Sequence, residues 1–553
     1  MRLIHKVAAV GVLLWTTGCL YTSDNVDSSV LMDAPRCGCD REPEQNLSDA
    51  GPRWEPIRGG TIHVRIHREP TGLLSLVDPD PLVVSLIDHS VLESLVRVSP
   101  EGEGIDPELA TGYEWDEKTH TYTFHLDPKA RWHDGEKLTS DDVSFVFGRL
   151  MDPDKVSIFS GELSNISQLT TPDKSTVVFR LDKPQPAFLY TLAAIPILPA
   201  HVYGRTPLTL HPASRAPVGS GPFRFFRWIP SKEIELARNQ AWRGEAPFVD
   251  RIRYHIVKDD RVALDLFARG DLDIVTALDV HSRPRVEDGR WIDFIGPVYR
   301  AWLYNTKRSV FKQRQVRQAM GKLIDRGAIG CSILDCRAQL IDHPWSLDAL
   351  KLGRFSSQEA ARSFDPQGAE RLLEEDGWRD KDGDGVRERR GIRLSFSLLL
   401  SAPDRDVRRT AVVVQEDLKR AGIEMQIITV NRSSYERKLK EGRFDAAVVS
   451  LEIKPKFSGW SLFHSDAIGG GENFGSFSDP GVDALIDELQ LTQLEERRKE
   501  LIKALTSKLR ILQPMSYTFV PQRSYLVRDG IAGIRMRNGW FEQSSIRWVR
   551  KEP

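Results

Sequence analysis

The chain has 553 residues and a mass of 62.6 kDa, enough for about three or four domains at roughly 150 residues each. It carries 77 Lys and Arg against 78 Asp and Glu, a formal charge of −1, so it lacks the basic excess that attracts a nucleic-acid backbone. Apolar residues make up 40% and charged residues 28%, which excludes a largely disordered chain.

The N-terminus has the pattern of an export signal. Three residues that can carry positive charge precede an apolar run at 7–15, and small residues then lead to Cys19. This pattern predicts a signal peptide over 1–18. A nine-residue helix would span only about 13 Å of the roughly 30 Å of hydrocarbon, so no transmembrane helix is expected here or elsewhere.

The small residues that end in Cys19 resemble the lipobox of bacterial lipoproteins, which implies a lipid-anchored cysteine. Thr16 departs from the pattern, which usually has leucine there, so an ordinary secretory signal is the alternative. Residues 19–56 are rich in Asp, Ser, Pro and Glu and are expected to form a flexible tether.

Four other cysteines remain. Cys331 and Cys336 flank four residues, a spacing that can close into a disulfide in an oxidising compartment. Cys37 and Cys39 are too close to pair comfortably, and a metal site would need two further ligands that the neighbouring sequence does not supply. No metal site is therefore predicted.

Local patterns predict helices and strands from about residue 60 onward. Tyr122, Phe124 and Leu126 alternate with polar residues, as in a strand with one buried face. Thr139 can cap a helix that follows. Its apolar residues fall on one face and are Val143, Val146, Phe147, Leu150 and Met151.

A second region has the pattern of a βαβ unit. Strands are predicted over 394–398 and 423–427, and between them lies a helix that Gly422 terminates. The strands should be parallel, with a right-handed crossover. A later helix is expected to begin at Asp479 and Pro480, a capping residue and a first-turn proline.

Two apparent metal motifs have simpler interpretations. Asp380, Asp382 and Asp384 begin like a calcium-binding loop, but Gly391 stands where a glutamate should complete the shell, so a turn is predicted. His63 and His67 lie about 13 Å apart if their segment is a strand, too far to share an ion. No sequence signature of a hydrolase, a metalloprotease or a nucleotide-binding loop is present, and no cofactor is predicted.

Several segments, in chain order, resemble family 5 of the extracytoplasmic solute-binding proteins, which serve ABC importers of oligopeptides, dipeptides and nickel chelates. The segments are LATGYEW (109–115), YTFHLDPKARWHDGEKLTSDDVSFVF (122–147), VGSGPFRF (218–225), NQAW (239–242), FVDRIRYHIVKDDRVALDLFARGDLDI (248–274), YNT (304–306), VRQAMGKLIDR (316–326) and GRFD (442–445). The resemblance extends from about Gly59 to the C-terminus.

The resemblance implies an α/β fold: a two-lobed periplasmic binding protein of type II, cluster C, with an inserted subdomain in lobe one and a hinge of two crossover strands. The expected divisions are a signal peptide at 1–18, a tether at 19–56, lobe one at 57–97, the inserted subdomain at 98–215, lobe one again at 216–305, lobe two at 306–510 and a return to lobe one at 511–553.

The family resemblance also suggests ligand-binding residues. The candidates are Ser220, Gly221, Arg300, Trp302, Asn305, Lys454, Trp460 and Asn473. Peptide binders of this family place an aspartate for the peptide ammonium shortly after the segment that matches Phe444 and Asp445, but Lys454 stands near that position here. This charge inversion favours a ligand with an anionic group, unless Lys454 is a solvated loop residue.

The predicted function is a non-enzymatic receptor, lipid-anchored in the periplasm or on the cell surface. It would capture a peptide-like or other small polar solute as a monomer and deliver it to ABC importer permease subunits. One alternative is a nickel or metallophore chelate binder that uses a histidine such as His464 or His89. An exported hydrolase and a lipoprotein without a transport role are two further interpretations, from different functional classes.

Overall fold

A computed structural model describes residues 54–551 of the chain, apart from short gaps. The gaps are 78–79, 100–103, 153–158, 205, 209–210, 277–285, 296–297, 346–362, 402–404, 453–455, 493, 535, 538–539 and 542–545. The predicted signal peptide, Cys19 and most of the predicted tether lie outside the described residues. The last tether residues, 54–56, form part of strand β1 (Trp54–Ile57), which pairs with β25 (Arg547–Lys551).

Within the described residues, one 12-stranded sheet runs through most of the fold in the order β19-β18-β20-β14-β21-β12-β2-β11-β10-β9, and β13 and β15 also pair with β21. The strand bounds are β2 Thr61–Ile66, β9 Phe223–Ile229, β10 Glu233–Arg238, β11 Arg251–Ile256, β12 Ile274–Val275, β13 Gly289–Ile295, β14 Val298–Tyr304, β15 Ala338–Leu340, β18 Ser395–Ser401, β19 Glu424–Val430, β20 Ala446–Glu452 and β21 Met515–Arg528.

The same local arrangement occurs twice in this sheet. Strand β2 lies between the parallel strands β11 and β12, and the antiparallel β21 follows β12. Likewise, β18 lies between the parallel strands β19 and β20, and the antiparallel β14 follows β20. Helix α6 (Asp260–Arg269) connects β11 to β12, and α13 (Arg405–Arg420) connects β18 to β19. Two α/β lobes of the predicted fold class are therefore confirmed.

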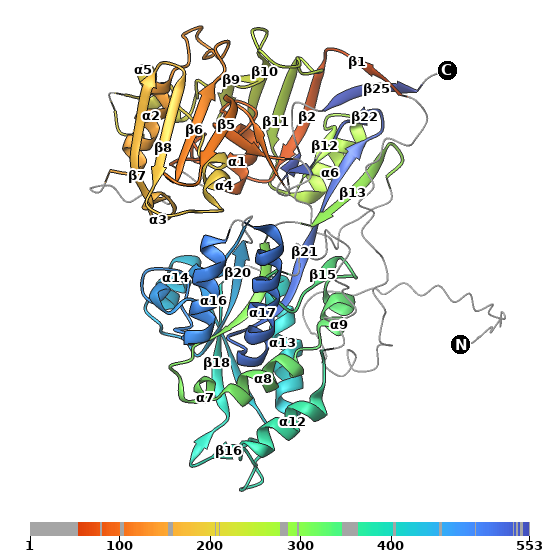
Figure 1. The fold of residues 1–553 in the computed structure, drawn as a ribbon. Coiled ribbons are helices and arrows are strands. Elements are labelled where there is room, and N and C mark those ends of the chain that lie inside the picture. The colour runs from red at the N-terminus through yellow and green to blue at the C-terminus, as the bar shows by residue number, and fades with distance from the viewer. Residues whose placement is uncertain are drawn as a thin grey trace, which may run out of the picture. The chain divides into compact units, whose positions relative to one another are not determined.

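Strand β21 belongs to both lobes (Figure 1). Its first residues, Met515–Phe519, pair with β14, and its later residues, Gln522–Arg528, pair with β13. Strand β13 ends at Ile295 and β14 begins at Val298, and both strands pair with β21. Strand β14 pairs with β20 of lobe two, so its contacts would place the lobe boundary before Val298; the boundary predicted at 305 stays a prediction.

A separate four-stranded sheet lies within the predicted insertion. Its order is β5 (Ala110–Asp116), β6 (Thr121–Leu126), β8 (Thr176–Leu181) and β7 (Ile166–Asp173). The predicted helix is α2 (Ser140–Leu150), and the Asp142 carboxylate accepts a hydrogen bond from the Thr139 N–H at 2.9 Å. The predicted stripe from Val143 to Leu150 is buried, whereas Met151 is the C-cap.

The predicted βαβ unit is also confirmed, because β18 and β19 are parallel in full register. Helix α16 (Pro480–Leu491) begins at the predicted cap, where the Asp479 carboxylate accepts the N–H groups of Gly481 and Val482. Among the described residues, the other helices of at least six residues are α1 Pro81–Ile87, α4 Phe188–Ala193, α8 Arg314–Leu323, α12 Pro366–Glu375, α14 Arg432–Lys440 and α17 Glu495–Leu512.

Hydrophobic cores hold the lobes together internally. One core joins the lobe-one sheet to the insertion and contains Ile62, Val64, Phe124 and Phe179. Two further cores cover opposite sides of the lobe-two strands, since Trp302 and Tyr304 of β14 enter one and Tyr299 and Leu303 the other. In the part of the chain that the structure describes, no helix is both long and apolar enough to cross a membrane.

Candidate functional site

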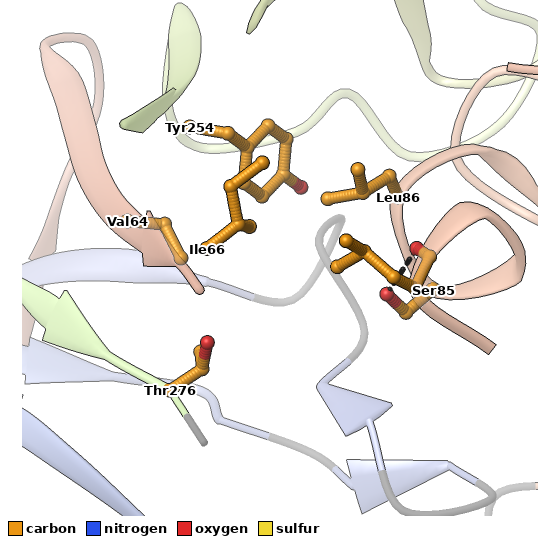
Figure 2. Close-up of a pocket in the computed structure, with 7 residues that line it drawn as sticks. Val64, Ile66, Ser85, Leu86, Tyr254 and Thr276 are labelled. Atoms are coloured by element: carbon orange, nitrogen blue, oxygen red, sulfur yellow. Dashed lines mark hydrogen bonds between the residues drawn. The ribbon is translucent and has the colours of Figure 1, made fainter. Parts of the chain in front are cut away.

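A small cavity lies at the carboxyl ends of the parallel lobe-one strands (Figure 2). Val64 and Ile66 of β2 line it together with Tyr254 of β11 and Thr276, which directly follows β12. Leu82, Ser85 and Leu86 of helix α1 line the other side. The atom-free space is about 240 Å³ including open solvent, less than the roughly 300–1,000 Å³ of small-molecule sites, so this cavity alone does not enclose a peptide-sized solute. Ligands of open α/β sheets bind at this end of the strands, so the cavity marks a candidate site.

Strand pairing explains why these side chains meet. Val64 stands opposite Tyr254 on one side and opposite Ile274 on the other, so three strands end together. Helix α1 follows β2 in the chain, and Asp80 caps it by accepting the Leu82 N–H at 2.8 Å. The Ser85 hydroxyl donates to the Leu82 carbonyl at 2.6 Å, which leaves a mainly apolar lining.

Cationic groups lie next to this cavity. His67 directly follows Ile66, and its Nδ1 is buried without a hydrogen-bond partner. Burial lowers the pKa of His67, and the positive charges of Arg68, Arg65 and Arg523 lower it further. Arg523 lies on β21, and its charge also acts on Tyr525, whose pKa is raised by burial. Arg65 and Arg68 form ion pairs with Asp260 and Asp80, so their charges are largely balanced.

The predicted Ser220–Gly221 segment is a tightly packed loop. A Cβ on Gly219 would lie 1.8 Å from the Val91 carbonyl oxygen, and one on Gly221 would lie 2.5 Å from that of Ser90. His133 accepts the Gly219 N–H through Nδ1 at 3.2 Å, and its Nε2 therefore donates to the Gly221 carbonyl at 3.0 Å. Ser220 is buried. The loop thus has a clear structural role, and ligand binding by it stays a prediction.

Three further candidates are buried and engaged with the protein. Trp302 is 1% exposed and packs in a lobe-two core. The Asn305 amide donates to the carbonyls of Gly442 and Phe444 at 3.1 and 3.0 Å. The Asn473 amide donates to the carbonyls of His464 and Phe477 at 2.9 and 2.8 Å. These contacts hold local backbone, and ligand roles for the three residues stay predictions.

The three remaining candidates are Arg300, Trp460 and Lys454, which lie in different segments of the chain. Arg300 lies half-buried on β14, and its carbonyl accepts the Thr518 hydroxyl at 2.8 Å. Trp460 begins α15 (Trp460–Phe463) and stacks on His464, with ring centroids 5.7 Å apart. Lys454 lies outside the described residues. The charge inversion inferred at Lys454 therefore stays a prediction.

The possible metal ligands lie at two places in the described residues, and the prediction that neither holds a metal stays a prediction. His63 lies on β2, and its Nδ1 is 2.9 Å from Nε2 of His255 on the neighbouring strand, not near His67. The carboxylates of Asp380, Asp382 and Asp384 gather in an exposed turn, and Asp384 pairs with Arg393.

The histidines considered for a nickel chelate differ in their contacts. His89 Nδ1 lies 2.9 Å from a carboxylate oxygen of Glu108, whereas His464 Nε2 is buried and makes no hydrogen bond within the described residues, although Asp487 lies 3.3 Å away. His464 also accepts the Asp466 N–H through Nδ1. Neither histidine lines the cavity.

The predicted disulfide partners lie close together. The sulfur atoms of Cys331 and Cys336 are 3.3 Å apart, and both residues are thiols in the structure. They are partly exposed and lie at the end of a helical turn before β15. A bridge between them stays a prediction.

The cavity residues and Arg523 were not among the predicted candidates. Their side chains come from β2, β11, β12, β21 and α1, which are separated by up to about 460 residues of sequence. The sequence offered one signal for these residues, the carboxyl end of each predicted parallel strand, because ligands of open α/β sheets bind at those ends. His67 was considered only as a partner for His63.

Comparison with known proteins places these features in a family. The model of the bacterial extracellular solute-binding proteins, family 5, middle region, matches residues 104–467, more than half of the chain. The oligopeptide-binding protein AppA of Bacillus subtilis is 24% identical over 519 residues, which cover 90% of this chain and 93% of AppA.

Solved structures have the same fold. The structure of AppA in complex with a nonapeptide is 22% identical in sequence and has a TM-score of 0.74. The match covers 90% of this chain and 100% of the AppA chain. NikZ of Campylobacter jejuni in complex with Ni(L-His) gives 0.73 at 22% identity, covering 88% and 99%. AgaA of A. tumefaciens R10 in complex with agropinic acid gives 0.69 at 25% identity, covering 89% and 99%.

Proposed function

The chain belongs to the bacterial extracellular solute-binding proteins of family 5, and we propose that it captures a peptide-like or other small polar solute for an ABC importer. The solute would bind at the carboxyl ends of the parallel strands and reach the permease subunits chemically unchanged. AppA, which matches nine-tenths of the chain, is an oligopeptide-binding protein and supports this proposal.

The observation that carries the proposal is the cavity at the ends of β2, β11 and β12, beside strand β21, which both lobes share. A solute that places one of its groups there would lie next to the strands on which the lobes would turn. It would favour a closed arrangement only through contacts that the open arrangement lacks. A transporter could then distinguish loaded from empty receptor by shape.

We also propose that the receptor is a lipid-anchored monomer in the periplasm or on the cell surface. The signal-like N-terminus and Cys19 support export and acylation. Radiolabelled palmitate incorporated by wild type and lost in Cys19→Ser would support the anchor. Secretion of wild type without label would contradict it.

A nickel chelate binder is the second candidate, because NikZ with bound Ni(L-His) has the same fold. The hydrogen bond of His89 to Glu108, and the absence of both histidines from the lining of the cavity, favour the peptide-like solute instead. Elemental analysis of protein purified without chelators tests the difference. Stoichiometric nickel would favour the second candidate.

Native mass spectrometry of gently purified protein tests the main proposal. We expect a small adduct that denaturation releases intact and that raises the melting temperature when it is added back. Release of a cleaved product, or turnover that scales with protein concentration, would contradict a receptor. Absence of any adduct, together with no melting shift across a broad panel of peptides, would also contradict it.

A further inference from the structure

We propose that Cys331 and Cys336 form a reversible thiol–disulfide exchange site whose oxidation state controls how firmly β15 is held on β21. The two sulfur atoms lie 3.3 Å apart, and both residues are thiols in the structure. Both residues are partly exposed, so a disulfide from solution can reach them. This redox site goes beyond the capture of a solute.

Strand β15 pairs with the part of β21 that lies between its contacts with the two lobes (Figure 1). Val520 and Pro521 of β21 pair with β15. The residues before them, up to Phe519, pair with β14, and those after them, from Gln522, pair with β13. Within the described residues, β15 is therefore the strand that holds β21 where it passes from one lobe to the other.

The thiol pair is connected directly to this contact. Arg337 alone separates Cys336 from β15, and the Arg337 carbonyl accepts the Gln522 N–H at 3.0 Å. The Cys336 N–H donates to the Gly330 carbonyl at 2.8 Å, so the turn closes onto the residue before Cys331. A constraint at the two sulfur atoms therefore acts on the β21 backbone through one intervening residue.

The turn that carries the thiols is fixed at both of its ends. Ile329 and Leu334 are buried in the lobe-two core that also contains Leu340 of β15. Between these anchors, Asp335 and Cys336 have φ angles of 49° and 56°, in the left-handed region. Residues other than glycine adopt this conformation at a cost in free energy and keep it only where their surroundings enforce it. A bridge between the sulfurs enforces it covalently, whereas two thiols leave it to weaker contacts.

The exchange needs an organic disulfide as the oxidant. One thiolate of the pair attacks this disulfide, forms a mixed disulfide and releases one sulfur of the oxidant as a thiolate. The second thiolate attacks the mixed disulfide, forms the Cys331–Cys336 bond and releases the other sulfur. Two electrons pass to the oxidant, and the two thiol protons end on the two thiols that it releases. Two thiols of a reductant reverse the same steps.

Mixtures of reduced and oxidised glutathione test whether the site is reversible. The full chain is equilibrated at several ratios of the two forms, and the remaining thiols are trapped with a maleimide and located by peptide mass spectrometry. We expect the pair to be oxidised where glutathione disulfide predominates and reduced again when the ratio is reversed. A pair that glutathione disulfide never oxidises, or a bridge that reduced glutathione never opens, would overturn the proposal.

Hydrogen–deuterium exchange tests whether the bridge acts on β21. The first amide to follow is that of Gln522, which donates to Arg337. The second is that of Ile341, which donates to the Thr518 carbonyl at 3.2 Å. Because the bridge restricts local opening of β15, we expect both amides to exchange at least about fivefold more slowly in the oxidised protein than in the reduced protein. Strand β6, in the separate four-stranded sheet, should exchange equally in the two states.

The matched variants are Cys331→Ser and Cys336→Ser, because serine is similar in size to cysteine and cannot form the bridge. In both variants, exchange at Gln522 should equal that of reduced wild type at every glutathione ratio. Cys37 and Cys39 remain in these variants, so a redox dependence that survives either substitution would overturn the proposal.

The comparison of oxidised with reduced wild type needs no substitution and no solute. Equal exchange at Gln522 in the two states would overturn the proposal, because the bridge would then constrain only its own turn. These outcomes are separate from the tests of the proposed function, which depend on a bound solute.

Discussion

The guanidinium of Arg243 holds both oxygens of Glu93 in a bidentate ion pair, with N···O distances of 2.8 and 2.7 Å. The side chains are 9% and 1% exposed. The same guanidinium bonds to Asp127 at 3.1 Å and to the Glu108 carbonyl at 2.9 Å. This pair joins the segment after β10 to the segment after α1, two parts of lobe one that lie 150 residues apart.

We therefore expect Arg243→Gln to lower the free energy of unfolding by about 3–5 kcal/mol, because it leaves the Glu93 carboxylate buried without its partner. Urea denaturation measures the change. Arg432→Gln, which breaks an exposed i,i+4 pair with Glu436, is the control and should cost less than about 1 kcal/mol. Similar losses in the two variants would contradict a buried pair.

The close approach of Gly219 to Val91 gives a second prediction. Gly219→Ala places a Cβ within 1.8 Å of a backbone oxygen, so the loop must move, at a cost of about 3 kcal/mol. Gly148→Ala on α2 has no neighbour within 4 Å and should stabilise the protein by up to about 1 kcal/mol through helix propensity. In thermal unfolding, Gly219→Ala should therefore lower the melting temperature and Gly148→Ala should raise it. A Gly219→Ala variant as stable as wild type would show that the loop packs more loosely.

The cysteine pair gives a third prediction. If Cys331 and Cys336 are bridged in the exported protein, reduction should lower the free energy of unfolding by about 2 kcal/mol, as expected for a short loop. A maleimide reagent should label neither thiol before reduction and both after it. Cys331→Ser should make stability insensitive to reductant. Full labelling of oxidised wild-type protein would contradict the bridge.

Local features were predictable because neighbouring residues determine them. The alternation at Tyr122 to Leu126 produced β6, and the cap at Thr139 with its apolar stripe produced α2. The same holds for α16 after Asp479. In each case, the hydrophobic periodicity or the capping residue that predicts the element lies within one short segment of sequence.

Long-range relationships were not predictable in this way. A ligand role for Asn305 stays a prediction, and no local pattern indicated that its amide donates to the carbonyls of Gly442 and Phe444, 137 and 139 residues away. The meeting of Val64 and Tyr254 at the cavity likewise depends on the pairing of β2 with β11, and no local pattern records that pairing. Strand register and the partners of buried polar groups therefore require the folded chain.

His133 gives a final prediction, on the dependence of stability on pH. Burial is the main reason that the pKa of His133 falls from 6.5 to about 4, and the positive charge of Arg224 lowers the pKa further. The hydrogen bond to the Gly221 carbonyl and the negative charge of Asp134 raise the pKa and so oppose this change. Between pH 6.5 and 4 the unfolded chain binds a proton that the folded chain excludes, so acidification favours unfolding. The contribution of His133 is thus present above pH 6.5 and is lost as the pH falls to about 4.

Lowering the pKa from 6.5 to about 4 corresponds to about 3 kcal/mol, and His133→Gln should remove this part of the acid sensitivity. Urea unfolding of wild type and variant at pH 7 and pH 4.5 measures it. The variant should be less stable than wild type at pH 7, because it disturbs the bonds to Gly219 and Gly221, but the difference should shrink at pH 4.5. His125→Gln, at an exposed position on β6, is the control. An unchanged difference between the two pH values would show that His133 is not held neutral by its burial.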